Sequence, residues 1–324
     1  MNSKPLEALS IGQCVFEYLN GFIGKGSVHT IFHRVINISW PDGNLWSISR
    51  CDVSNGPANI ITNLSLAEDF TRYGIEPGTL VSYDKQNSLL NIGGLSVSLK
   101  GGALWKSPLA QHHSPLPAPF VKKNLAEAEG WLRHSSRSSG LTKLFTHLAA
   151  LEQGTFSLPR SSDPVLLLTG QALHRLLPGI YSADQAVIAE AAASLIGLGP
   201  GLTPSGDDYL AGLLLSLAAG KKSSSGTAAA ALGLAHGTLT RVILERAPQL
   251  TNDISAQMLS LAVQGTGSEL MENMVCALFY EPQSGGPSSP FQAARKLSAV
   301  GASSGLDQLL GILSGARIYA KISS

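Results

Sequence analysis

The chain has 324 residues, of which 44% are hydrophobic, so it can bury a sizeable core and has room for about two domains. Its 23 Lys and Arg residues nearly balance its 22 Asp and Glu residues, and no dense basic run appears, which argues against nucleic acid as a partner. The three isolated cysteines predict neither a disulfide framework nor a zinc site. The start lacks a continuous apolar segment and the apolar runs are short for a bilayer, so we expect a cytoplasmic protein with no membrane partner.

The first third of the chain, residues 1–105, is predicted to form a small β-rich domain, barrel-like or a sandwich. Short runs of β-branched and aromatic residues recur there, at 28–40, 45–53 and 80–99. Turn-forming residues break these runs, as at Pro41–Gly43 and at Gly93.

A proline-rich stretch at 106–121, which includes His112 and His113, is predicted to be a linker. The remainder, 122–324, is predicted to be a larger, mainly helical domain, so the fold class is α+β. Helix-forming residues recur between clear stops at 122–133, 141–152, 164–177, 182–195, 204–219, 227–246, 255–263, 269–280, 291–297 and 305–320. Residues 220–226 and 281–290 are predicted to be polar loops.

The most informative segment is a glycine-rich turn that opens one of these helices, from Gly197 to Leu210. Gly199 and Gly201 favour a tight turn that exposes backbone amides, and amides at a helix N-terminus bind small anions. The hydroxyls of Thr203 and Ser205 and the amide of Gly206 would complete such a site. Either Thr203 or Ser205 could cap the helix, and the sequence does not separate these alternatives.

A related signature occurs 99 residues later. Residues 205–212 and 304–311 share Ser, Gly, Asp, Leu and Gly at equal offsets, so Ser304, Gly305 and Asp307 correspond to Ser205, Gly206 and Asp208. For Asp208 and Asp307, simple helix capping is an equally good explanation. The last glycine of each signature, Gly212 and Gly311, is costly within a helix unless two helices approach closely. We therefore expect both helix starts to converge on one cleft.

Two adjacent carboxylates, Asp207 and Asp208, are the predicted catalytic residues. They would repel the anion that the amides attract, unless a divalent ion such as Mg²⁺ bridges them or one carboxylate points elsewhere. Asp207 would position a substrate nitrogen, handle a proton or bind Mg²⁺. No histidine or cysteine pair with metal-ligand spacing appears, so no other metal is predicted.

Two further polar positions are candidates. His29 interrupts a β-like apolar run and is a candidate substrate contact, although an ordinary strand histidine is the stronger explanation. Residues 251–255 open another helix, where capping by Thr251 or Asp253 is the stronger explanation and ligand contact the weaker one.

Taken together, these segments resemble the AllH-type subunit family of oxamate carbamoyltransferase. The likeness is carried by Ser27–Phe32 with Asn37, by Gly197–Gly212, by Thr251–Ser255 and by Ser303–Asp307. The resemblance implies a role in ureide (allantoin) catabolism, in which the assembled enzyme interconverts oxalurate plus phosphate with oxamate plus carbamoyl phosphate. It also implies companion carbamoyltransferase subunits. These small anionic metabolites suit a glycine-rich helix N-terminus.

Two other functions are alternatives. A phosphotransferase resembling sugar kinases would use Ser205–Asp208 as its anion hole, although strands and helices alternate in those folds. A non-catalytic scaffold subunit would use the acidic turn only as a helix cap.

Overall fold

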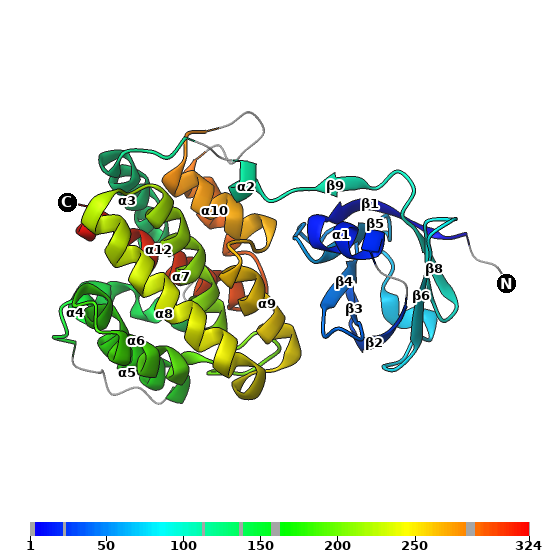
Figure 1. Ribbon diagram of the computed structural model, residues 1–324, viewed down its shortest axis with the longest axis horizontal. Helices are drawn as coiled ribbons and strands as arrows, with labels where there is room; N and C mark the ends of the chain where they lie inside the picture. The colour runs from blue at the N-terminus through cyan, green and yellow to red at the C-terminus, as the bar shows by residue number, and fades with distance from the viewer. Residues whose placement is uncertain are drawn as a thin grey trace. The chain divides into compact units, whose positions relative to one another are not determined.

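A computed structural model describes residues 4–21, 24–111, 114–135, 139–156, 163–282 and 289–323. The chain divides into two compact units, residues 1–110 and 111–324 (Figure 1). His112 and His113 of the predicted linker lie outside the described residues, as does most of the predicted loop 281–290.

The first unit is a β-barrel of eight strands, with a ninth strand beside the first. The strands are β1 (Leu6–Gly12), β2 (Lys25–Ile31), β3 (Val35–Ser39), β4 (Leu45–Ser49), β5 (Asn59–Thr62), β6 (Leu80–Asp84), β7 (Leu89–Ile92), β8 (Leu95–Ser98) and β9 (Ala103–Trp105). They pair in the order β5-β4-β3-β2-β6-β7-β8-β1-β9, and a further pairing of β5 with β1 closes the barrel. Closure removes the open sheet edges along which chains aggregate.

Strand β1 closes the barrel because it pairs on both of its edges. One edge is antiparallel to β5, with Ala8 opposite Thr62. The other edge is parallel to β8 at Leu6 and then to β9 at Ser10. Helix α1 (Gln13–Gly21) follows at once, and its buried Val15 and Leu19 contribute to the barrel core.

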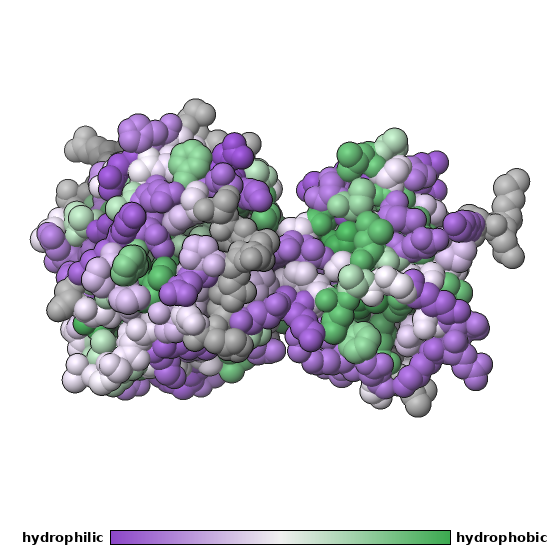
Figure 2. All heavy atoms as spheres, turned by 90° about the horizontal axis from the view of Figure 1, so that it is seen from above, coloured by the Kyte–Doolittle hydropathy of each residue, from purple (hydrophilic) through white to green (hydrophobic). Residues whose placement is uncertain are grey.

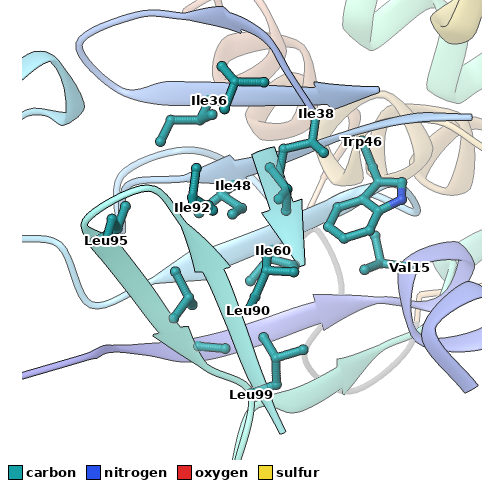
Figure 3. Packing of buried hydrophobic residues seen from close by; sticks show 14 of the residues in the cluster. Val15, Ile36, Ile38, Trp46, Ile48, Ile60, Leu90, Ile92, Leu95 and Leu99 are labelled. Carbon is teal, nitrogen blue, oxygen red and sulfur yellow. The ribbon is translucent and has the colours of Figure 1, made fainter. Parts of the chain in front are cut away.

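The barrel interior is filled by one side of each strand, since successive side chains point to opposite faces. Ile36, Ile38, Ile48, Ile60 and Leu90 point inward and are fully buried (Figure 3). The face of the barrel seen in Figure 2 also carries an apolar area. Among the described residues of this unit, the exposed large apolar ones are Leu9, Phe16, Phe32, Leu66, Leu80 and Leu104.

The prediction of a β-rich unit followed by a helical one is confirmed, but its details needed correction. The run 28–40 forms most of a two-stranded hairpin, and 80–99 contains three strands. Gly43 and Gly93 do form the turns, with φ of +83° and +55°. The sequence did not predict β1, because its pairing with β5 shifts register between Ala8 and Ser10 and this irregularity breaks the alternation of apolar and polar residues; α1 was also missed.

Two long helices form the centre of the second unit (Figure 1). Helix α7 (Ser205–Lys222) is buried at every position from Ser205 to Leu217, and α12 (Ser304–Ile322) from Gly305 to Ala316. A helix that is apolar on all sides is expected to lie inside a domain. The other helices pack around this pair.

Apart from the first of them, which forms within the predicted linker 106–121, the surrounding helices match the predicted ones within a few residues. They are α2 (Pro108–Gln111), α3 (Ala118–His134), α4 (Leu148–Glu152), α5 (Pro164–Tyr181), α6 (Gln185–Leu195), α8 (Gly226–Leu250), α9 (Asp253–Val263), α10 (Glu269–Phe279) and α11 (Pro290–Leu297). The predicted helix 141–152 is instead a 3-10 helix, η2 (Gly140–His147), that continues into α4, and α7 extends into the predicted loop at 220–226. Another 3-10 helix, η1 (Phe70–Tyr73), lies in the barrel.

Helix α8 is longer than predicted and, by length and composition alone, could cross a membrane. Within the domain it instead packs against α6, α7 and α9. Its buried side includes Leu232, Leu239 and Ile243. One apolar face turned to a domain core explains its composition.

Candidate functional site

The centre of the helical domain is a close crossing of α7 and α12 at two glycines. A Cβ atom added to Gly212 would lie 2.2 Å from the Gln308 carbonyl oxygen, and one added to Gly311 would lie 2.1 Å from the Tyr209 carbonyl oxygen. Because Gln308 occupies in α12 the position that Tyr209 occupies in α7, the two contacts are reciprocal. The predicted close approach of the two helices is therefore confirmed.

A second pair of glycines fixes both helix starts. A Cβ atom on Gly206 would lie 2.0 Å from the carbonyl oxygen of Leu195, at the end of α6, and one on Gly305 would lie 1.9 Å from that of Leu297, at the end of α11. The Gly206 amide donates to the Leu198 carbonyl, and the Gly305 amide donates to that of Val300. Each central helix is thus locked to the helix before it in the same way.

The loop before α7 is strongly bent and exposes its backbone. Gly197, Gly199 and Gly201 adopt φ of +74°, +127° and +96°, in the region that favours glycine. Within the described part of the chain, five amides between α6 and the first residue of α7 donate no hydrogen bond. These are the amides of Gly199, Gly201, Leu202, Thr203 and Ser205.

Neither predicted cap forms. Helix α7 begins after Pro204, which has no side-chain donor or acceptor, and Ser303 before α12 makes no capping hydrogen bond. The Thr203 hydroxyl instead lies 2.9 Å from the Ser304 hydroxyl and joins the two loops. Both helix N-termini, with their partial positive charge, therefore meet at Thr203 and Ser304.

The carboxylate of Asp207 is fully buried, and both of its oxygen atoms accept hydrogen bonds. Its Oδ1 accepts from the Gly197 amide at 2.8 Å, and its Oδ2 accepts from the Thr251 and Ser255 hydroxyls at 2.5 and 2.6 Å. A Cβ atom on Gly197 would lie 2.0 Å from the Leu250 carbonyl oxygen. Asp207 thus ties the glycine-rich loop to the junction of α8 and α9.

This arrangement also revises the interpretation of residues 251–255. Asn252, rather than Thr251 or Asp253, caps α9, because its side chain accepts from the Ser255 amide. Thr251 is thereby free to bond to Asp207.

Asp208 turns to α12 instead. Its Oδ1 accepts from the Gln308 side-chain amide at 2.7 Å, whereas its Oδ2 is buried and makes no hydrogen bond of ordinary geometry to any described residue. Burial, reinforced by the charge of Asp307, raises the pKa of Asp208 to about 8, although the nearby amide of Gln308 and the hydroxyls of Ser304 and Thr203 act in the opposite direction. Asp208 is therefore mostly protonated at neutral pH.

Asp307 lies at the equivalent position of α12 and is also fully buried. Its Oδ1 accepts from the Leu141 amide at 2.6 Å, at the start of η2, while its Oδ2 makes no hydrogen bond to a described residue. Burial raises the pKa of Asp307 to about 6, although the Leu141 amide and the hydroxyls of Ser205 and Ser303 oppose this. Neither Asp208 nor Asp307 is a cap of its own helix.

These contacts separate the two carboxylates that the sequence places side by side. Asp207 faces α8 and α9, and Asp208 faces α12, so one carboxylate does point elsewhere. Among the described residues, no three His, Cys, Asp or Glu side chains are grouped as a metal site. The neutral form of Asp208 lessens the repulsion of an anion, whereas Asp307, with a pKa of about 6, is mostly ionised at neutral pH.

The structure brings together most of the predicted site residues. Thr203, Ser205, Asp208, Ser304 and Asp307 lie around the meeting point of the two helix starts, and the two carboxyls are buried beneath half-buried hydroxyls. A pocket of about 560 Å³ lies elsewhere, between α5 and α6, with Leu168 and Arg175 in its wall.

His29 belongs to the barrel unit. It occupies the irregularity of β2 between Val28 and Thr30, where the pairing with β3 shifts by one residue. Such bulges re-aim side chains. Its predicted ligand contact stays a prediction.

Two participants were missed by the sequence analysis. Gln308, which fixes Asp208, stands where the first signature has Tyr209, so the repeat itself gave no indication of it. The Leu141 amide comes from a segment 166 residues before Asp307. Only the fold brings such distant groups together.

Two models of known families match the chain. A family model described as oxamate carbamoyltransferase subunit AllH matches residues 195–316, which include both loops and both helix starts. A second, described as the AllH family N-terminal domain, matches residues 7–104, which cover the barrel. No solved structure matches the chain. The chain belongs to the AllH family of oxamate carbamoyltransferase subunits, with the N-terminal domain of that family.

Proposed function

We propose that this subunit acts in the interconversion of oxalurate plus phosphate with oxamate plus carbamoyl phosphate, in the cytoplasm and together with companion subunits. A small anion, phosphate or carboxylate, would bind at the loop from Gly199 to Asp208. In the phosphate-consuming direction, a phosphate oxygen attacks the carbamoyl carbon of oxalurate. The bond from that carbon to the oxamate nitrogen breaks, and this nitrogen takes a proton.

The observation that carries the proposal is the set of unbonded amides before α7. Five N–H groups lie within seven residues, at a point where two helix N-termini meet, and no described carboxylate accepts from them. Backbone amides and helix dipoles together form a common anion site. The hydroxyls of Thr203, Ser205 and Ser304 would add further donors.

Asp207 has a positioning role in this proposal. Its carboxylate holds the Gly197 amide and so fixes the conformation of the loop that presents the other amides. Asp208 and Asp307 would face the reacting carbamoyl group. The exposed apolar side chains of the barrel, such as Phe16 and Leu104, support contacts with companion subunits.

The proposal is tested by comparing two glycine variants in the enzyme reconstituted with its companion subunits. Gly201→Ala and Gly265→Ala both place a side chain at strongly positive φ, +96° and +81°, with no atom near the new Cβ. Each should cost about 1 kcal/mol of stability. Only Gly201→Ala should disturb the amides, raising the KM for phosphate about tenfold while Gly265→Ala leaves it unchanged.

Equal kinetic effects of the two variants would contradict the anion site. Omitting this chain from the assay should abolish carbamoyl transfer. A scaffold role predicts a different result, in which transfer requires the chain but the KM for phosphate is insensitive to Gly201→Ala.

A further inference from the structure

The cluster formed by Asp208, Asp307 and Gln308 contains three buried oxygen atoms that make no hydrogen bond of ordinary geometry to a described residue, although serine and threonine hydroxyls lie near both carboxyls. They are Oδ2 of Asp208, Oδ2 of Asp307 and Oε1 of Gln308. Asp208 and Asp307 are fully buried, and Gln308 is 7% exposed. Leaving one buried polar atom unpaired is costly, so three in one cluster at the meeting point of two helices indicate a ligand.

The hydrogen bonds that do form define what each of these atoms can do. Gln308 donates through Nε2 to Oδ1 of Asp208, so Oε1 of Gln308 is left as an acceptor. Asp307 accepts the Leu141 amide at Oδ1, so its Oδ2 is a second acceptor. The proton of a neutral Asp208 must sit on Oδ2, because Oδ1 is already an acceptor, so this atom is a donor.

Two acceptors and one donor complement a primary carbamoyl group, which has two N–H donors and one carbonyl acceptor. We propose that this cluster binds the H₂N–C=O group of the substrate, with Asp307 and Gln308 accepting from its nitrogen and Asp208 donating to its carbonyl oxygen. This inference rests on the proposed function, in which the anionic end of the same substrate lies at the loop amides. The half-buried Thr203 and Ser304 hydroxyls, which adjoin Asp208, lie between the two subsites.

A related ligand without the nitrogen tests this assignment. Acetyl phosphate keeps the phosphate and the carbonyl of carbamoyl phosphate but has a methyl group in place of NH₂, so it would leave both acceptors unpaired. Calorimetry on the full chain assembled with its companion subunits should show carbamoyl phosphate binding at least about tenfold more tightly than acetyl phosphate.

Asp307→Asn should remove this preference. Its amide oxygen would have to accept the Leu141 N–H, so an N–H donor would replace Oδ2 and face the donors of the substrate. The affinity for acetyl phosphate should be unchanged. Asp184→Asn is the matched control, since Asp184 caps α6 and Asn is an equally good cap. If Asp307→Asn does not fold, Gln308→Met removes the other acceptor at similar volume.

Equal affinity of the unaltered protein for carbamoyl phosphate and acetyl phosphate would overturn the carbamoyl subsite but would not contradict the anion site. A preference that survives in both Asp307→Asn and Gln308→Met would also overturn it. Failure to bind inorganic phosphate, acetyl phosphate or carbamoyl phosphate would overturn the proposed function as well.

Discussion

Asp207 and Asp208 are neighbours in the chain, yet their environments give them different properties. Asp207 receives three hydrogen bonds, from one amide and two hydroxyls, so its charge is well solvated by the protein. Asp208 receives one from Gln308 and keeps an unbonded oxygen. Burial then favours the neutral form of Asp208, which would lessen the repulsion of the anion that we propose to bind nearby.

The raised pKa of Asp208 predicts how stability changes with pH. The folded state holds this proton up to about pH 8, whereas the unfolded chain releases it near pH 4. The contribution to stability is therefore full below about pH 4 and is lost as the pH rises toward 8. Asn at this position cannot ionise. As the pH rises from 5 to 8, the free energy of unfolding of Asp208→Asn should therefore fall less than that of the unaltered protein, and the difference should be on the order of a few kcal/mol.

Urea unfolding at several pH values measures this difference directly. The exposed-cap variant Asp184→Asn should follow the pH dependence of the unaltered protein. Parallel curves for Asp208→Asn and the unaltered protein would show that Asp208 is ionised throughout.

For single residues, the sequence predicted which residue types take part in the site better than it predicted their hydrogen-bond partners. The glycines, hydroxyls and carboxylates of the two signatures do meet, because helix starts and tight turns have local sequence requirements. Gln308 and Leu141 could not be found in this way, since their positions depend on which helices pack together. Asn252 caps α9 while the Thr251 hydroxyl donates to Asp207, and this second contact exists only because the fold brings Asp207 close.

Among the helices, the crossing of α7 and α12 depends on the absence of side chains at Gly212 and Gly311. Each glycine lets the backbone of the partner helix approach to contact distance. Such close packing brings both N-termini to one point, and the reciprocal pattern gives the site an approximate twofold symmetry.

Adding a single methyl group at this crossing should therefore be destabilising. Gly212→Ala gains about 1 kcal/mol in helix propensity. Its Cβ would overlap the Gln308 carbonyl, however, and relieving the overlap requires a shift of the helix backbone, so we expect a net loss of about 1–3 kcal/mol in the free energy of unfolding. Denaturant unfolding of the full chain gives this value.

Gly237→Ala in α8 is the matched control, because nothing lies within 4 Å of the new Cβ. It should stabilise the protein by up to about 1 kcal/mol. A Gly212→Ala variant as stable as Gly237→Ala would mean that the two helices are not held at this distance.

Helix positions were predictable from the sequence because caps, breakers and apolar periodicity are local signals. Ten predicted helical segments correspond to observed ones, including the starts of α7 and α12. The barrel strands were less predictable. The register of β1 shifts between Ala8 and Ser10, and β5 contributes only Asn59–Thr62, so neither shows a long alternating pattern.

On the scale of the whole molecule, the chain combines a closed barrel with a helical domain built around two equivalent helix starts. The family matches fall on these same parts, residues 7–104 and 195–316, and pass over most of α3 to α6. The parts that define the family thus include every residue of the proposed anion site. As a subunit of a carbamoyltransferase, the chain belongs to an enzyme that has other subunits.

The central claim is that the amides before α7 bind the anion of the substrate, and hydrogen–deuterium exchange of the full chain measures those amides directly. Adding phosphate or carbamoyl phosphate should slow exchange in the peptide from Gly199 to Ser205, because its unbonded N–H groups gain an acceptor. Unchanged exchange there, with protection elsewhere in the helical domain such as the wall between α5 and α6, would contradict the account.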